Sequence, residues 1–335
     1  MEVIQLYTRK EIERIIRLDP SLIKVIEQAF TSLVTKKVTM PPIMRIDVPE
    51  HNGEVDIKSA FIEGEDSFAV KLSSGFFNNP SLGLPTSGGM MILLNSRTGQ
   101  PLAVLADDGM LTDLRTAAAG AVGAAYCSRK DARRAGIIGT GAQARLQLKA
   151  LTFVRPIDHV YVYGRKVERA EAYKEEMEKE LGLPVTICSS VKEAVAESDI
   201  VVTTTPSRKP LIFAEWMKPG LHITAMGSDA EHKQELDHGV LEKADSITCD
   251  VIHQSERLGE LRGAAALKSP VMELGELTSR RKQARTSDEE ITVCDLTGTG
   301  VQDTAIARFT WNALNNKGDD HDERSQNEHQ IHLGR

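Results

Sequence analysis

A glycine-containing turn at residues 139–144 follows a short apolar run at residues 135–138 and leads directly into a helix-forming run. The order strand, Gly-x-Gly turn, helix is typical of a dinucleotide site. Gly139 permits a tight turn, Gly141 lets the backbone approach a pyrophosphate, and the small Ala144 lets the helix pack closely on the sheet. The N–H groups at the helix start then face the negative charge. Because glycine turns also form for purely steric reasons, the motif by itself leaves both interpretations open.

The residues after the second strand indicate which dinucleotide binds. Residues 158–163 are expected to form this strand, about 20 residues past the turn, where an acidic residue would bind the ribose 2′-hydroxyl of NAD. The chain has Gly164, Arg165 and Lys166 there. A carboxylate would repel a 2′-phosphate, whereas Arg and Lys attract one, so NADP(H) is favoured and NAD(H) is the alternative. The same cations also suit the start of a charged helix at residues 166–180.

Two further strands are expected, at residues 198–206 and 221–229, each ending in a polar turn. Strands that alternate with helices predict an α/β fold with a doubly wound parallel sheet of the Rossmann type, and ligands bind beyond the carboxyl ends of its strands. The expected cofactor-binding residues are Thr116, Gly139, Thr140, Gly141, Ala142, Gln143, Gly164, Arg165, Lys166, Thr204, Thr205, Met226, Gly227 and Ser228.

Composition favours an enzyme over several other classes. The net charge of −7 argues against nucleic-acid binding, and no apolar run approaches the ~18 residues of a membrane span. The N-terminus has early acidic residues and no signal-peptide pattern, which favours a cytoplasmic location. Four cysteines without CxxC spacing predict buried free thiols, and the scattered histidines predict no metal site.

A length of 335 residues favours two domains. Residues 1–120 are expected to form a second α+β domain, mostly antiparallel and completed by residues 302–320, and residues 121–301 the Rossmann domain. The polar tail, residues 315–335, is expected to be disordered. Expected elements outside the Rossmann strands are helices at 21–33, 111–125 and 302–314 and strands at 56–62, 67–72, 90–94 and 291–296.

Three cations of the first domain have apolar neighbours in the sequence: Arg45, Lys71 and Arg115. Burying such a side chain is costly unless an anion compensates it. If the three converge on one cavity, they form a receptor for a carboxylate, which Arg can bind through both oxygens. Each cation taken singly is equally compatible with a surface or ion-paired role, and the sequence alone does not establish convergence.

Two acidic residues are candidates for contact with substrate. Asp229 follows an expected strand end, at the edge where a nicotinamide would lie, and could exchange a proton with a substrate nitrogen. A turn or N-cap role is the alternative, since Asp is common after Gly-Ser. Asp56 is the second candidate, and it could instead belong to the polar face of a strand.

Five blocks of sequence, in this order, resemble the ornithine cyclodeaminase/mu-crystallin family over nearly the whole chain. They are residues 111–119, 139–144, 225–229, 258–261 and 297–303. Within the family the chain looks closest to the ectoine-utilisation protein C group, because of residues 40–45 and 227–233, which would connect it with ectoine degradation.

The resemblance implies a homodimer whose Rossmann domain is joined to a domain that pairs the subunits and binds substrate. Arg45, Lys71 and Arg115 match the positions that hold the substrate α-carboxylate, and Asp229 matches the catalytic carboxylate beside the α-nitrogen. Asp56 falls where the cyclodeaminase has a glutamate that binds the distal amine of ornithine, and it is one carbon shorter.

Two chemistries are implied by this resemblance. In the first, NAD(P)H reduces the C=N bond of a small imino acid such as pyrroline-2-carboxylate. In the second, recycled NAD converts ornithine to proline with loss of ammonia. The Arg165/Lys166 pair and the short Asp56 favour the reductase, an oxidoreductase of amino acid metabolism. A third hypothesis, a non-enzymatic NADPH-linked binder, is less favoured because aromatic residues make up only 4% of the chain.

Overall fold

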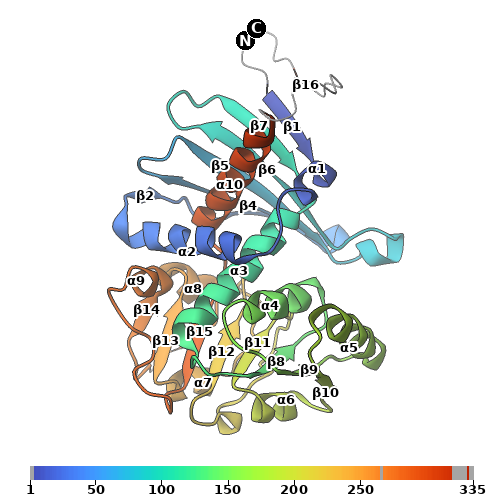
Figure 1. Cartoon of the computed structure of the whole chain (residues 1–335), viewed down its shortest axis with the longest axis vertical. Helices are drawn as coiled ribbons and strands as arrows, with labels where there is room; N and C mark the ends of the chain where they lie inside the picture. The colour runs from blue at the N-terminus through green and yellow to red at the C-terminus, as the bar shows by residue number, and fades with distance from the viewer. Residues whose placement is uncertain (1–3, 265–266, 319–329, 332–335) are drawn as a thin grey trace. The chain divides into compact units, whose positions relative to one another are not determined.

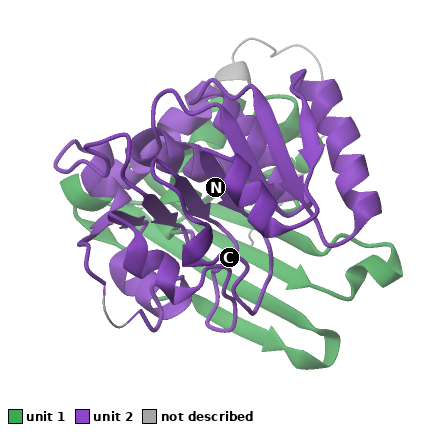
Figure 2. Ribbon diagram, turned by 90° about the horizontal axis from the view of Figure 1, so that it is seen from below, with its two compact units in different colours: residues 1–17, 32–115, 299–335 green, residues 18–31, 116–298 purple. Residues whose placement is uncertain are grey.

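The computed structural model describes residues 4–264, 267–318 and 330–331, and these form two compact units (Figure 2). Unit 1 comprises residues 1–17, 32–115 and 299–335, and unit 2 comprises residues 18–31 and 116–298. The expected boundaries at 120 and 301 therefore shift to 115 and 298. Residues 18–31 were assigned to the wrong domain, because an amphipathic helix in the sequence does not reveal which core its apolar face joins.

Unit 1 is built on a mostly antiparallel sheet, as expected, with strand order β16-β1-β7-β6-β5-β4-β2 and with β3 paired to β4. Only β1 and β7 pair in parallel among its described strands. Its elements are β1 (Ile4–Thr8), α1 (Arg9–Glu13), β2 (Val38–Thr39), β3 (Met44–Val48), β4 (Gly53–Ile62), β5 (Ser67–Phe76), β6 (Ser87–Asn95), β7 (Pro101–Ala106), α10 (Gly300–Gly318) and β16 (Gln330–Ile331).

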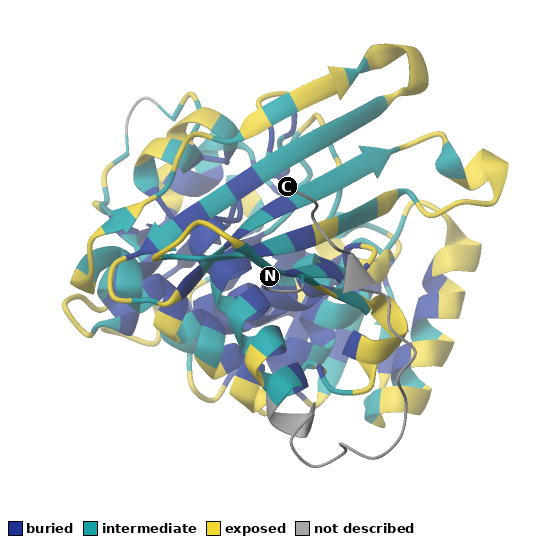
Figure 3. Cartoon of the chain, turned by 90° about the horizontal axis from the view of Figure 1, so that it is seen from above, coloured by how far each residue is buried: buried dark blue, intermediate teal, exposed yellow. Residues whose placement is uncertain are grey.

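Helix α10 packs on one face of this sheet, against β4, β5 and β6. Buried and partly exposed positions alternate along the strands, as the two-residue period of a strand requires (Figure 3). On β5, Ala69 and Lys71 are buried while Val70 is only partly so. The Thr304 hydroxyl donates to the Ala60 carbonyl at 2.7 Å and accepts from the Ala69 N–H at 3.1 Å. The side chain of Thr304 thereby fixes α10 on the sheet face that carries Lys71.

Unit 2 contains the expected parallel sheet, with strand order β10-β9-β8-β11-β12-β15-β13-β14 (Figure 1). Its strands are β8 (Arg134–Ile138), β9 (His159–Tyr163), β10 (Val185–Ile187), β11 (Ile200–Thr203), β12 (His222–Ala225), β13 (Ser246–Cys249), β14 (Val271–Glu273) and β15 (Thr292–Asp295). Unit 2 also contains most of α2 (Pro20–Thr35) and most of α3 (Met110–Cys127). Its remaining helices are α4 (Ala142–Thr152), α5 (Val167–Leu181), α6 (Val191–Glu197), α7 (His238–Lys243), α8 (Ile252–Leu258) and α9 (Leu274–Thr278).

Two hydrophobic cores lie on the two faces of this parallel sheet. Neighbouring strand residues join different cores: Ile137 packs with α4 and α5, whereas Ile138 packs with α6 and α7. Val201 and Val202 on β11 divide in the same way. Chain order runs from β8 outward to β10 and then returns to β11 on the other side of β8, so the strand order reverses between β8 and β11. Ligands of doubly wound folds bind at that reversal, outside the carboxyl ends.

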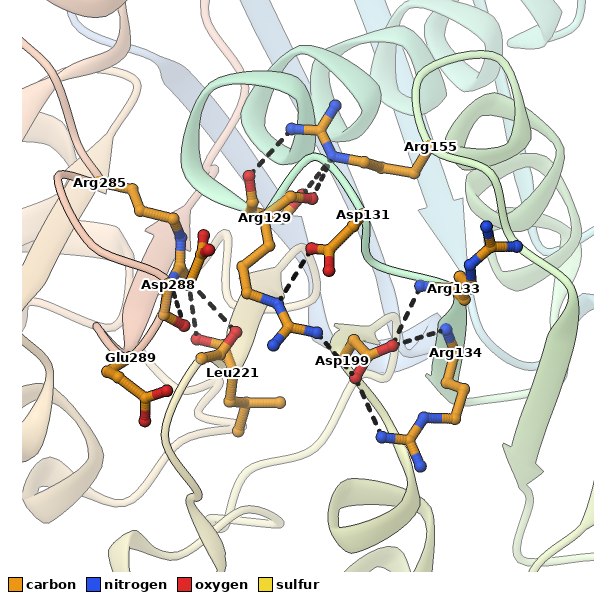
Figure 4. A network of polar contacts seen from close by, with 12 residues as sticks. Arg129, Asp131, Arg133, Arg134, Arg155, Asp199, Leu221, Arg285, Asp288 and Glu289 are labelled. Atoms are coloured by element: carbon orange, nitrogen blue, oxygen red, sulfur yellow. Dashed lines mark hydrogen bonds and ion pairs between the residues drawn. The ribbon is translucent and has the colours of Figure 1, made fainter.

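The opposite, amino edge of the parallel sheet is fixed by charged side chains (Figure 4). The Asp199 carboxylate, just before β11, accepts the N–H groups of Arg133 and Arg134 at 3.0 Å each and pairs with the Arg134 guanidinium at 3.1 Å. Arg155 donates to the carbonyls of Ala124 and Ala125 in the last turn of α3 and to that of Ser128 just after it. Cations at a helix C-terminus compensate the helix dipole.

The expectation of a disordered tail is partly wrong. Residues 315–318 continue α10, and Gln330 pairs with Gln5 of β1 at the sheet edge, whereas residues 319–329 and 332–335 lie outside the described residues. The prediction for the cysteines is confirmed, since Cys127, Cys188, Cys249 and Cys294 are all buried free thiols. No helix within the described ranges combines the length and apolar character that crossing a membrane requires.

Candidate functional site

The glycine turn follows β8 at the point where the strand order reverses. Gly139 has φ 126°, a conformation that favours glycine, and a Cβ there would lie 2.5 Å from Thr204 Oγ1. The Gly139 N–H donates to the Tyr163 carbonyl at 2.9 Å, and the Thr204 N–H donates to the Ile138 carbonyl at 3.0 Å. The turn is therefore tied to the carboxyl ends of β9 and β11, which places two expected cofactor-binding segments side by side.

No packing contact within the protein requires a glycine at Gly141. It is the N-cap of α4 without a side-chain cap hydrogen bond, and no other atom lies within 4 Å of a Cβ built there. The first N–H groups of a helix have no partner inside it, and they bind anions well. Ala144, in the first turn of α4, is fully buried, as the motif predicted. An open glycine at an uncapped helix start fits a pyrophosphate.

Arg145 supports the turn from outside and was missed at the level of sequence. Its Nη1 donates to the carbonyls of Thr140 (2.6 Å) and Gly141 (3.2 Å), and its guanidinium lies over the Tyr173 ring at 5.3 Å. A long cation one turn into the helix, just after a glycine turn, is the pattern that could have identified it.

Gly164 follows the last residue of β9, and a Cβ there would lie 2.6 Å from Thr140 Cγ2. The next two residues, Arg165 and Lys166, are exposed, and Lys166 is the N-cap of α5. Two exposed cations therefore stand immediately after the strand that ends next to the glycine turn. They can bind an additional phosphate there, and they also start a solvated helix.

Asp229 lies beyond the end of β12, and its side chain is 43% exposed. The Lys233 ammonium contacts its Oδ1 at 2.6 Å, and Lys233 is itself nearly buried. The Ser228 hydroxyl donates to the Lys233 carbonyl at 3.1 Å, which closes this short loop. The carboxylate is thus accessible and paired with a cation that the sequence analysis did not single out.

The segments that follow β11 and β12 are joined by a buried carboxylate. Glu235, fully buried, accepts hydrogen bonds from Thr203, Thr205 and Gly227. Burial raises the pKa of Glu235, and these hydrogen bonds oppose the shift. Nothing in the local sequence marks Glu235, because its partners lie 8 to 32 residues away.

Lys71 and Arg115 meet on one carboxylate inside unit 1. Lys71 Nζ lies 3.0 Å from Asp303 Oδ2, and Arg115 Nε lies 3.0 Å from Asp303 Oδ1. All three side chains are buried, and Gln302 Oε1 lies 3.3 Å from Arg115 Nη1. In the sequence, Asp303 stood out only as a member of the block 297–303. A charged residue inside the apolar start of α10 is the pattern that could have identified it.

Burial and neighbouring cations alter the acidity of Lys71. Desolvation and the charge of Arg115 lower its pKa from 10.5 to about 7, a net shift that Asp303 opposes. Lys58 lies directly opposite Lys71 in the β4–β5 register and adds to the positive potential. The result is a buried group of cations with an anion, Asp303, already among them.

Arg45, the third cation of the expected receptor, pairs with other carboxylates than that of Asp303. Its guanidinium contacts Asp47 at 2.9 Å, Glu54 at shorter range and Asp56 at 3.6 Å, because β3 pairs in register with the acidic end of β4. Asp56 is opposite Ser73, two residues from Lys71, so Arg45 and Lys71 project from the same sheet face. Arg45 is thus near the Lys71 region but held by acidic neighbours.

The parallel sheet with a glycine turn at its strand reversal defines a Rossmann-type dinucleotide-binding protein. The chain belongs to the ornithine cyclodeaminase/mu-crystallin family, whose model matches residues 2–318. Among the described residues, no group of three or more His, Cys, Asp or Glu side chains is arranged to hold a metal ion.

Three comparisons place the chain among known proteins. It is 48% identical over 317 residues to the uncharacterized cyclodeaminase y4tK of Sinorhizobium fredii (strain NBRC 101917 / NGR234), covering 93% of this chain and 96% of that protein. It superimposes with a TM-score of 0.88 and 30% identity on the Thermococcus litoralis Delta(1)-pyrroline-2-carboxylate reductase in complex with NADH and L-proline, covering 94% and 98% of the two chains. It matches an archaeal alanine dehydrogenase dimer with bound NAD at a TM-score of 0.88 and 34% identity, covering 99% and 100%.

Proposed function

We propose that this protein is an NAD(P)H-dependent oxidoreductase that reduces the C=N bond of a small imino acid, such as pyrroline-2-carboxylate, to an amino acid. The observation that carries the proposal is the buried pair Lys71 and Arg115 on the single carboxylate of Asp303. Two buried cations against one anion leave a positive charge that a substrate carboxylate would neutralise. Support also comes from the NADH and L-proline bound by the Thermococcus litoralis reductase.

The proposal assigns each charged group one task. Lys71 and Arg115 bind the substrate carboxylate, and Arg45, on the same sheet face, is a further candidate for this contact. Asp229 holds or moves the proton at the substrate nitrogen, and the Lys233 ammonium lies 2.6 Å from its Oδ1. When bound, the dinucleotide supplies the hydride. The remaining contribution of the chain is orientation, which accounts for a large part of enzymatic rate enhancement.

For the dinucleotide, we propose contacts with the glycine turn, with Thr116 near the middle of α3 and with the polar residues that follow β11 and β12. Gly141 and the start of α4 would receive the pyrophosphate. Arg165 and Lys166 favour NADP(H), because both are exposed beside the ribose-binding edge. NAD(H) remains the alternative, since the two solved relatives carry NADH and NAD.

Ornithine cyclodeaminase chemistry is the second candidate, favoured by the name of the relative y4tK. That reaction needs a group that holds the distal amine of ornithine, and Asp56 is the residue that the family resemblance offers. Asp56 Oδ1 lies 3.6 Å from the Arg45 guanidinium, so a cation already occupies the place of a substrate ammonium. This contact favours the reductase.

We propose that the protein is a homodimer that pairs through the open face of the unit 1 sheet. Residues Met44, Ile57, Leu72 and Met90 are aligned across β3, β4, β5 and β6 on the face opposite Lys71. Met44 is 58% exposed and Met90 41% exposed. An exposed apolar patch on a sheet favours a protein partner, and an archaeal relative was solved as a dimer. Light scattering on Leu72→Asp should give the monomer mass where the parent gives twice that mass; a dimeric variant would contradict the proposal.

A cytoplasmic location is also proposed, since four free thiols suit a reducing compartment. The resemblance to the ectoine-utilisation protein C group stays a prediction that substrate profiling can test.

The central experiment measures absorbance at 340 nm while the protein is offered NADPH or NADH with pyrroline-2-carboxylate, acyclic imines of small 2-oxo acids, or L-ornithine with NAD. We expect cofactor oxidation with an imino acid and no ammonia release from ornithine. Asp229→Asn should keep cofactor affinity and lose about a hundredfold or more in kcat, because it removes the proton-handling group. Glu231→Gln is the matched control, two residues away. Unchanged absorbance over the whole imine panel would reject the reductase.

A further inference from the structure

Glu235 makes four hydrogen bonds with an arrangement that only a carboxylate can satisfy. Oε1 accepts the N–H and the hydroxyl of Thr205, both at 2.6 Å. Oε2 accepts the Gly227 N–H at 2.8 Å and the Thr203 hydroxyl at 2.6 Å. Each carboxylate oxygen therefore receives one backbone N–H and one hydroxyl. Within the described chain, no Lys or Arg forms an ion pair with Glu235.

These partners belong to the two chain segments that leave neighbouring strands at the carboxyl edge. Thr203 is the last residue of β11 and Thr205 follows it, whereas Gly227 follows β12, which ends at Ala225. The segments approach so closely that a Cβ on Gly227 would lie 2.1 Å from the Thr205 carbonyl oxygen. Glu235 thus joins the segment after β11 to the segment that leads, two residues later, to Asp229.

Glu235 is itself held in place by a second buried acid. The Glu260 carboxylate accepts the N–H groups of Glu235 at 2.8 Å and Leu236 at 3.2 Å. Asp295, at the end of β15, in turn accepts the Glu260 N–H at 2.9 Å. The backbone that carries Glu235 is therefore fixed to the central strands of the sheet. Its side chain in turn holds the segments after β11 and β12 at the carboxyl edge of the sheet.

We propose that Glu235 is a positioning residue for hydride transfer: it locks the segments after β11 and β12 together and thereby sets where Asp229 stands relative to the cofactor edge. The inference rests on the proposed function. Glu235 does not touch substrate, and its effect passes through Thr205 and Gly227. We call the four hydrogen bonds of the Glu235 carboxylate the joint. An acid is needed in the joint because every partner donates a hydrogen bond.

Glutamine cannot replace Glu235 in this joint. An amide has one accepting oxygen, and in either orientation its NH₂ group meets a backbone N–H, that of Thr205 or that of Gly227. A hydroxyl can rotate to accept, but a backbone N–H cannot. One segment must therefore move away. Displacements of about 1 Å at a site of this kind reduce rates about a hundredfold.

Glu290→Gln supplies the matched control. Glu290 also accepts two backbone N–H groups and one hydroxyl, but both N–H groups, of Thr286 and Ser287, go to Oε2, while Oε1 takes the Thr286 hydroxyl. An amide satisfies all three donors in that arrangement. Glu290 also precedes β15, whose first residue is Thr292, so it lies at the amino edge of the sheet, away from the proposed site.

The test compares the parent enzyme, Glu235→Gln and Glu290→Gln by steady-state kinetics, by fluorescence titration of NADPH and by the isotope effect with each C4-deuterated NADPH stereoisomer. For Glu235→Gln we expect kcat to fall about a hundredfold, the NADPH dissociation constant to change less than about fivefold, and the isotope effect on kcat to increase. Glu290→Gln should behave like the parent. A Glu235→Gln enzyme with the parent's kcat and isotope effect overturns the inference.

Two further results keep the inference separate from the proposed function. If the parent protein reduces no imine, the proposed function fails. NADPH titration of Glu235→Gln then measures only how the joint between the segments after β11 and β12 affects cofactor binding. If Glu235→Gln does not fold, Thr203→Val tests the same joint, because it removes the hydroxyl that donates to Oε2. Thr203→Val should lower kcat about tenfold with cofactor binding retained; an unchanged kcat would overturn the inference.

Discussion

Lys71 and Arg115 share the carboxylate of Asp303 in the antiparallel unit, whereas Glu235, Glu260 and Asp295 are buried in the parallel-sheet unit without an ion pair to any described Lys or Arg. The first group has an excess of positive charge and the second an excess of acidic groups. Burial and the charge of Arg115 lower the pKa of Lys71 to about 7, whereas burial raises the pKa of Glu260 to about 7 and that of Asp295 above its usual range.

The difference separates a binding centre from an internal framework. Buried acids can hold protons and accept N–H groups, so Glu235 and Glu260 are satisfied by the protein itself. One carboxylate does not neutralise two cations. The cationic centre formed by Lys71 and Arg115 therefore gains stability from an external anion, whereas the buried acidic framework does not need one.

The sharpest test of the cationic centre is Arg115→Met. With Arg115 removed, Lys71 and Asp303 neutralise each other and no charge remains for a substrate carboxylate. Loss of a buried charged contact costs about 4 kcal/mol, so kcat/KM should fall about a thousandfold. Arg308→Met is the control, because Arg308 also lies in unit 1 but pairs with Glu65 and Asp66. Equal kinetics for the two variants would remove the carboxylate-binding role.

The acidic framework, formed by Glu235, Glu260 and Asp295, predicts that the stability of the fold depends on pH. The folded pKa of Glu260 is raised from 4.5 to about 7, so its protonated form stabilises the fold fully below pH 4.5, and this stabilisation is lost as pH rises to 7. The free energy of unfolding should fall by on the order of 3 kcal/mol over this interval. Urea unfolding of Glu260→Gln should show a much smaller fall, and Glu193→Gln, at an exposed acid, should leave it unchanged. A parent stability that rises over this interval would contradict the assignment.

The cationic centre predicts a separate pH effect, on substrate binding. Lys71 is protonated below about pH 7 and loses its charge above it, so kcat/KM and inhibition by L-proline should weaken as pH rises. The alkaline decline should approach about tenfold per pH unit. Lys71→Arg keeps the charge at all these pH values, so its profile should lose this decline. A decline that persists in Lys71→Arg would point to another group.

The smallest expected effect concerns an exposed charge. Arg165→Ala removes a partner of a 2′-phosphate in solvent, so NADPH binding should weaken about tenfold or less while NADH binding stays the same. Arg169→Ala, one turn further along α5, is the control. Equal losses for both cofactors would remove the preference for NADP(H).

Local sequence determined the parts of this protein whose partners lie close along the chain. The Gly139 and Gly141 turn, the alternating strands and the helix of α10 follow from backbone conformation and periodicity over a few residues. The apolar neighbours of Lys71 and Arg115 and the strand end before Asp229 made these residues candidates, and the family resemblance added their expected roles. Tertiary structure decided the rest: Lys71 meets Asp303 across 232 residues, Arg45 pairs with the acids of β4, and Glu235 joins Thr203 to Gly227. A sequence pattern cannot specify these contacts, because burial and charge pairing depend on which elements pack together.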